Sequence, residues 1–297
     1  LPGPEAQQLA IYIGWLLHRT WGGVIAGVLF VLPSLFILIG LSWLYIAYGD
    51  VPVIAGLFYG LKPAVTAIVL QAAQRIGART LKNNWLWGIA GASFVAIFAI
   101  KLPFPLIIIG AALIGYLGGR LAPAKFSLGA GHGPAQQDFG PALIDDHTPT
   151  PAHARFRASR LALLLLVGAC LWLLPMGVLT AVFGWQGTLT QMGWFFTKAA
   201  LLTFGGAYAV LPYVYQGAVE HYAWLSPTQM IDGLALGETT PGPLIMVVAF
   251  VGFVGGYLQP MFGPEQVFMA GAVAAAVVTW FTFVLSFLLI LAGGPLV

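Results

Sequence analysis

The sequence predicts an all-α, polytopic integral membrane protein made of two homologous helical halves with broken helices, which we expect to be inverted repeats. Three observations support this fold class. Charged residues make up 7 % of the 297 residues, hydrophobic residues 60 %, and the mean hydropathy is +0.92, whereas a soluble domain carries about 25 % charged residues. Apolar runs long enough to cross a bilayer follow one another along the chain, and a Pro-Gly-Pro motif occurs twice in the same context. Most of the surface must therefore face lipid.

Apolar runs mark the expected spans, because a transmembrane helix needs about 20 apolar residues. In the first half they cover residues 22–48, 51–80, 85–100 and 105–121. In the second half they cover residues 161–182, 187–215 and 267–292, and Phe204-Gly205-Gly206 interrupts the middle one. We expect residues 1–121 to form the first half, residues 122–157 a polar linker, and residues 158–297 the second half.

The basic residues predict the orientation of the first half, since Lys and Arg near helix ends stay in the cytoplasm. Those at alternate ends of the spans and in the linker are Arg19, Arg75, Arg79, Lys82, Arg120, Lys125, Arg155, Arg157 and Arg160. Asp50 and Lys101 mark the other side, so the linker is expected to be cytoplasmic. No Lys or Arg follows Lys198, which leaves the orientation of the last third open.

The composition excludes several classes of protein. A net charge of +3 is too small for a phosphate-binding face, so we expect no nucleic-acid partner. Cys170 is the only cysteine, which excludes a disulfide framework and a thiolate metal cluster. The linker histidines His132, His147 and His153 do not have the spacing of metal ligands. Since the sequence also contains no nucleotide-binding glycine loop and no Ser-His-Asp pattern, we expect neither an enzyme, nor a cofactor, nor a metal.

The two Pro-Gly-Pro motifs open two similar segments. An apolar helix follows Pro2-Gly3-Pro4 and another follows Pro241-Gly242-Pro243. Each is expected to turn at glycines, Trp21-Gly22-Gly23 in one copy and Gly255-Gly256 in the other, into a long apolar span. Ser226-Pro227 should cap and begin a short helix before the second motif. The first copy has no such start, so we expect about 50 further residues before Leu1 by analogy with the second copy.

The helix breaks are the expected binding site. Backbone groups freed by a break inside the bilayer find no water, so breaks persist where they line a cavity. A helix that begins after a break presents unpaired N–H groups and a positive dipole end to an anion, and glycine allows close approach. Broken segments in corresponding places of two halves point to a transporter's site. The competing explanation is that Gly and Pro only kink membrane helices and allow them to pack closely.

Four ionisable residues, Lys62, Lys198, Asp232 and Glu238, fall within or beside the spans, where charges are costly and often functional. Lys198 precedes the Phe204 break and could balance a bound anion, and Glu238 precedes Pro241 and could carry a coupling proton. The alternatives are that Lys62 reaches the interface by snorkelling, that Asp232 caps an exposed turn, and that Lys198 and Glu238 only neutralise each other.

Longer motifs of the sequence resemble the chromate transporter family. In the second half they are residues 204–214 (FGGAYAVLPYV) and 232–245 (DGLALGETTPGPLI). In the first half they are residues 1–4 (LPGP), 8–10 (QLA), 12–14 (YIG), 30–34 (FVLPS) and 60–65 (GLKPAV). The resemblance covers the chain apart from the linker. It implies a two-half protein of the bacterial inner membrane that expels chromate, driven by the proton-motive force, and thereby confers chromate resistance. The first Phe-Gly-Gly-Pro segment of the family is missing, which agrees with the expected N-terminal truncation.

From the breaks, the charges and this resemblance we expect a multi-pass transporter with chromate, protons and lipid as partners; a homodimer is left open. The residues expected to bind the oxyanion are Gly205, Gly206, Thr239, Thr240, Pro241, Gly242, Pro243, Pro2, Gly3, Pro4, Lys198 and Lys62, and Glu238 is expected to couple protons. Sulfate is an alternative substrate because it is also a tetrahedral dianion. A passive anion channel, a membrane-embedded enzyme and a structural subunit are the rival functions.

Overall fold

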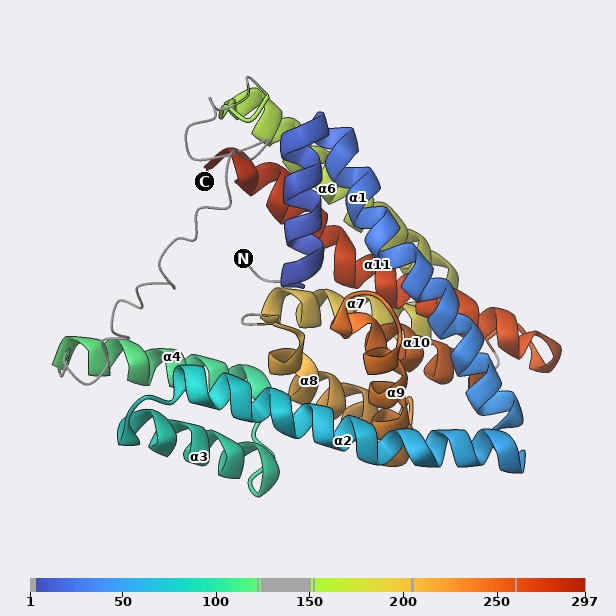
Figure 1. Ribbon diagram of the computed structural model, residues 1–297. Coiled ribbons are helices and arrows are strands. Elements are labelled where there is room, and N and C mark those ends of the chain that lie inside the picture. The colour runs from blue at the N-terminus through green and yellow to red at the C-terminus, as the bar shows by residue number, and fades with distance from the viewer. Residues whose placement is uncertain are drawn as a thin grey trace, which may run out of the picture. The chain divides into compact units, whose positions relative to one another are not determined.

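The computed structural model describes residues 4–121, 123, 151, 153–203, 206–259 and 261–296, and the regular elements in those residues are helices (Figure 1). The chain divides into two compact units, Leu1–Val69 with His153–Val297, and Leu70–Ala152. Among the described helices, those long and apolar enough to cross a membrane are Glu5–Tyr48 (α1), Pro52–Thr80 (α2), Phe104–Leu121 (α4), Ala158–Phe183 (α6) and Pro264–Gly293. The prediction of an all-α polytopic membrane protein is confirmed.

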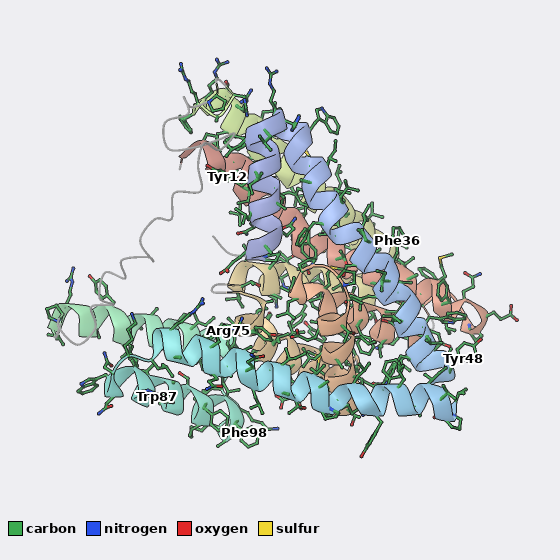
Figure 2. All side chains as sticks on the ribbon, viewed as in Figure 1. Tyr12, Phe36, Tyr48, Arg75, Trp87 and Phe98 are labelled. Atoms are coloured by element: carbon green, nitrogen blue, oxygen red, sulfur yellow. The ribbon has the colours of Figure 1, made fainter. Side chains whose placement is uncertain are left out.

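Large apolar side chains cover the outside of the helices. Phe36 on α1 is 67 % exposed, and Trp87 and Phe98 on α3 (Asn84–Phe98) are 60 % and 76 % exposed. Figure 2 shows these three side chains on the outer sides of their helices. Large exposed apolar side chains of this kind are typical of helices that face lipid or a partner.

Helix α1 is a hairpin of two limbs. His18 (φ −132°, ψ 30°) and Arg19 (φ 57°, ψ −157°) leave the helical region, and residues 5–17 and 20–48 run side by side (Figure 1). A Cβ atom on Gly22 would lie 2.2 Å from the carbonyl oxygen of Gly14, so the limbs touch through their glycines. The expected turn at Trp21-Gly22-Gly23 is therefore wrong. These residues are helical, and Gly22 serves the contact between the limbs.

A second hairpin follows Pro243. A short 3₁₀ helix, Leu244–Met246 (η2), leads into Val247–Tyr257 (α10), and the chain returns through η3 (Pro264–Gln266) to Val267–Gly293 (α11). Gly255 and Gly256 lie inside α10, which corrects the expected turn there. A glycine permits both a turn and a close helix contact. In α10, as in α1, glycine provides the contact, and Gly256 makes it with α11. Each Pro-Gly-Pro motif thus precedes a short helix packed against a long one, while the repeat itself stays a prediction.

The core of the larger unit surrounds α10, in which residues 247–256 are all buried. Helices α1, α9 (Pro227–Thr239), α11 and Thr188–Leu202 (α7) pack against it. The rings of Phe195, Phe196 and Trp224 fill the space beside α7, with centroids 5.0 Å apart for Phe195 and Phe196 and 5.6 Å apart for Phe195 and Trp224. Close packing is the main source of helix association in lipid, so this core holds α9 and the neighbouring helix breaks in place.

The smaller unit contains the end of α2 together with α3 and α4. Helices α3 and α4 pack against each other. The side chain of Asn83 caps α3 by accepting from the N–H of Leu86 at 2.9 Å. Most of the predicted linker, including His132 and His147, lies outside the described residues. His153 belongs to the larger unit, where its Nε2 atom lies 3.0 Å from the carbonyl oxygen of Trp15.

Candidate functional site

The chain breaks between α7 and α8, where the sequence predicts an interruption. Helix α7 ends at Leu202 and α8 (Ala207–Tyr215) begins after Gly206. The backbone of Gly206 (φ 97°, ψ 170°) is a conformation that glycine adopts and other residues avoid. Among the described residues, no heavy atom lies within 4 Å of the point that its Cβ would occupy. The N-terminus of α8 therefore has open space beside it; Phe204 and Gly205 lie outside the described residues.

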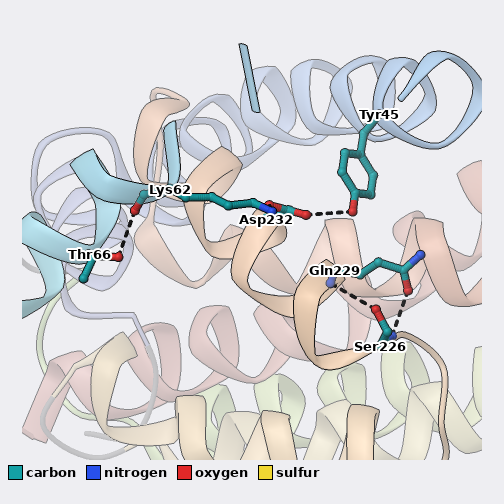
Figure 3. Close-up of polar contacts among 6 residues, drawn as sticks. All are labelled: Tyr45, Lys62, Thr66, Ser226, Gln229 and Asp232. Carbon is teal, nitrogen blue, oxygen red and sulfur yellow. Dashed lines mark hydrogen bonds and ion pairs between the residues drawn. The ribbon is translucent and has the colours of Figure 1, made fainter. Parts of the chain in front are cut away.

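Helix α9 begins and ends as the sequence indicates. The Ser226 side chain accepts from the N–H of Gln229, the Gln229 side chain accepts from the N–H of Ser226, and Pro227 is the first helical residue (Figure 3). At the other end, the hydroxyl of Thr239 donates to the carbonyl of Ala235 or Leu236, and that of Thr240 to Leu236 or Gly237. Both hydroxyl hydrogens are thus used by the helix end, so a bound anion would have to compete for them.

The Pro241-Gly242-Pro243 break packs against the long limb of α1. Gly242 has φ 138°, and its Cβ would lie 2.7 Å from both Cβ and Oγ of Ser34. Ser34 is 1 % exposed, and its Oγ has no hydrogen-bond partner among the described residues. It follows Pro33, which interrupts the hydrogen bonding of α1. Sequence reasoning assigned no role to Ser34, although a serine after a mid-span proline is a signal that it could have used.

Replacing Gly242 with Ala is expected to lower the free energy of unfolding by about 2 kcal/mol, because it combines a strained φ with overpacking against Ser34. Thermal unfolding in detergent, followed by tryptophan fluorescence, measures the loss. Gly40→Ala is the control. Gly40 lies on the limb of α1 that carries Ser34, and among the described residues no heavy atom lies within 4 Å of its Cβ position. Equal midpoints for the two variants would contradict the close contact at Gly242.

Glu238 joins the two breaks. The hydroxyl of Tyr208, in the first turn of α8, donates to Glu238 Oε1 at 2.6 Å, near the end of α9. Helix α8 also contacts η2, which follows the second break. The structure therefore brings Gly206, Glu238 and the Pro241-Gly242-Pro243 segment to one place. Tyr208 belongs to the motif at residues 204–214, but no role was predicted for it.

Lys198 does not reach Glu238. Its Nζ lies 5.7 Å from the ring centroid of Trp194, in cation–π geometry, and in the described part of the chain it forms no ion pair. The alternative in which Lys198 and Glu238 neutralise each other is therefore wrong. Pro4, another predicted site residue, is the N-cap of α1, and Pro2 and Gly3 lie outside the described residues.

Lys62 and Asp232 form an ion pair that the sequence did not predict. Lys62 Nζ lies 3.1 Å from Asp232 Oδ1, and the hydroxyl of Tyr45 donates to Asp232 Oδ2 at 2.8 Å (Figure 3). Asp232 is 3 % exposed in the middle of α9, so the alternative that it caps an exposed turn is wrong. Snorkelling is also wrong for Lys62, since its ammonium points to a buried carboxylate. Tyr45, which is far from Asp232 in the chain, was missed.

A polytopic helical membrane protein with two helix breaks at one place and charges held among its helices belongs to the class of membrane transport proteins. Comparison with known proteins narrows the class. The chain belongs to the chromate transporter family, whose model matches residues 1–116 and 190–297. This confirms the resemblance seen in the sequence.

Several curated proteins are similar to the chain. It is 33 % identical over 258 residues to the chromate transport protein of Pseudomonas aeruginosa, covering 86 % of this chain and 55 % of that protein. The chromate transport protein of Cupriavidus metallidurans is 29 % identical over 254 residues, covering 85 % and 54 %. The probable chromate transport protein of Synechococcus elongatus is 27 % identical over 254 residues, covering 85 % and 56 %. The chain spans about half the length of these relatives, and no solved structure matches it.

Proposed function

We propose that the protein exports chromate across the bacterial inner membrane, is driven by the proton-motive force, and thereby confers chromate resistance without acting as an enzyme. The observation that carries the proposal is that Tyr208, in the first turn of α8, donates to Glu238, which precedes the Pro241 break, and that α8 contacts η2, which follows this break. Helix N-termini favour anions through their free N–H groups and dipoles. The names of the relatives from Pseudomonas aeruginosa and Cupriavidus metallidurans support chromate as the substrate.

In this proposal the oxyanion lies at the two helix breaks. Gly206 and the segment Pro241-Gly242-Pro243 expose backbone to it, with Thr239 and Thr240 at its edge. Gly205 and the first motif, Pro2-Gly3-Pro4, contribute further backbone. Lys198 and Lys62 supply positive charge. Glu238 is the carboxylate that the sequence assigns to proton coupling, and its place between the breaks supports that assignment.

Transport is tested with everted membrane vesicles from cells that produce the full chain, in which export appears as chromate uptake. We expect energised vesicles to accumulate chromate and a protonophore to abolish the accumulation. Flux that continues with the protonophore indicates a passive channel. Inhibition by excess sulfate indicates a site for tetrahedral dianions in general. Cross-linking in the same membranes tests whether a homodimer forms.

The binding site is tested by Gly206→Leu, which is expected to reduce chromate uptake at least tenfold because the side chain fills the space beside the α8 N-terminus. The matched control is Gly263→Leu. Gly263 has nearly the same backbone conformation (φ 96°, ψ 161°) and the same open surroundings, but it lies in the turn between α10 and α11. The two variants therefore carry equal backbone strain. Equal uptake by both would contradict an anion site at Gly206.

A further inference from the structure

The ion pair of Lys62 and Asp232 connects three helices, α1, α2 and α9. The Lys62 ammonium lies 3.1 Å from Oδ1 of Asp232 as an ion pair, but Oδ1 accepts no hydrogen bond from the described residues, whereas the Tyr45 hydroxyl donates to Oδ2 at 2.8 Å. Its side chain is 4 % exposed, whereas that of Lys62 is 35 % exposed. The carboxylate is therefore buried in the helix packing, whereas the Lys62 side chain is partly exposed.

Three helices contribute the described groups around Asp232. Helix α2 brings Lys62 to it, α1 brings Tyr45, and α10 presents apolar side chains such as Phe250, whose ring packs 5.4 Å from that of Tyr45. On α9 itself, Glu238 accepts from Tyr208 at 2.6 Å and has no ion-pair partner in the described part of the chain. Asp232 and Glu238 thus lie on the same helix, and each accepts a hydrogen bond from a tyrosine hydroxyl. Among the described residues, only Asp232 also forms an ion pair.

A buried carboxylate stays charged only while a cation or several donors compensate it. If a dianion takes the Lys62 ammonium, Asp232 keeps one hydroxyl donor and loses its counter-charge. The lowest-energy response is to bind a proton. Protonation neutralises Asp232, so that Lys62, Asp232 and the dianion together carry one net negative charge in place of two.

Resting on the proposed function, we propose that Asp232 takes up a proton when a tetrahedral dianion displaces it from Lys62, so that this ion pair links anion binding to protonation. One bond, the Lys62–Asp232 ion pair, breaks; one ion pair, between Lys62 and the anion, forms; and one proton passes from solvent to an oxygen of Asp232. Release of the anion reverses these steps. Asp232 thereby carries a proton in the anion-bound state, a role distinct from the one proposed for Glu238.

The linkage is measured on the full chain in proteoliposomes by titrating chromate over the alkaline range in which it stays a dianion. The affinity of the unmodified protein should fall about tenfold for each unit rise in pH, the slope that one linked proton produces. Asp232→Asn, which keeps an acceptor for Tyr45, should bind chromate with little pH dependence. Lys62→Gln should lower the affinity at least tenfold, and Lys62→Arg should retain it.

The control is Glu265→Gln, which neutralises an exposed carboxylate in η3, outside the proposed site. We expect it to keep the pH dependence that Asp232→Asn removes. An Asp232→Asn protein with the unmodified slope overturns the proposal, as does a Lys62→Gln protein that folds and binds chromate normally. If Lys62→Gln does not fold, the Lys62→Gln/Asp232→Asn double variant, which has no unpaired charge, replaces it. If the unmodified protein binds no chromate, the proposed function is overturned as well. If it binds chromate but Asp232→Asn keeps the unmodified slope, only the proposal for Asp232 is overturned.

Discussion

Replacing Lys62 with Met is expected to destabilise the protein by about 1–3 kcal/mol, the cost of leaving a buried polar group without a partner, which is less than for a fully buried ion pair because the Lys62 side chain is 35 % exposed. Met keeps the length and apolar character of the lysine stem, so packing along α2 is preserved and the lost charge is the main change. What remains is Asp232, 3 % exposed and bonded only to Tyr45 among the described residues. The measurement is the thermal midpoint in detergent, followed by tryptophan fluorescence.

The double variant Lys62→Met/Asp232→Asn separates charge from packing. It leaves no charge to be compensated and keeps an oxygen that can accept from Tyr45, so we expect it to recover most of the lost stability. Neutral replacements of buried ion pairs are often no less stable than the pair itself. Recovery would show that the lysine is retained for a reason other than stability, in agreement with the proposed linkage. A double variant as unstable as Lys62→Met would show instead that the lysine stem itself is needed.

Helix positions could be predicted from the sequence because lipid restricts the choice. In hydrocarbon an apolar run of about 20 residues must satisfy its backbone internally, and a helix does so. The start of α9 was also predictable, since Ser226, Pro227 and Gln229 act within one turn of each other. The break at Gly206 was predictable for the same local reason.

The turns were harder to predict, because glycine has two uses in a membrane helix. Gly22 and Gly256 were expected to mark turns, and both instead allow two helices to touch. The reversal of α1 falls at His18 and Arg19, where no glycine or proline stands. Only the position of the neighbouring helix distinguishes a glycine in a turn from one in a contact, and that position is not a local property of the sequence.

The polar part of the site was predicted one residue at a time, without its pairs. A lone lysine in an apolar run is costly, which identified Lys62, but its partner Asp232 lies on another helix. Tyr45 is 187 residues from Asp232 in the chain. Charge pairs between helices depend on which helices pack together. The sequence therefore indicated which residues needed a partner and could not indicate which partner they had.

The second large effect is expected at Gly256, where Leu should cost more than about 3 kcal/mol through overpacking. A Cβ atom there would lie 2.5 Å from both the carbonyl oxygen and the Cβ of neighbouring residues on α11, Ala270 and Ala274 respectively. A clash with a flexible side chain is relieved by rotation, but a clash with backbone requires the helices to separate. Four residues earlier, Gly252 makes the same kind of contact, 2.9 Å from the carbonyl oxygen of Ala274.

Gly177→Leu is the control for this prediction, because Gly177 lies inside α6 with no heavy atom within 4 Å of its Cβ position. Both variants place a leucine in a membrane helix, so a difference in thermal midpoint reports the contact between α10 and α11 alone. Separation of these helices would also move η2, which precedes α10 at the second break. We therefore expect any Gly256→Leu protein that still folds to lose chromate uptake. A variant with normal stability and uptake would mean that α10 and α11 do not cross as closely as the glycines require.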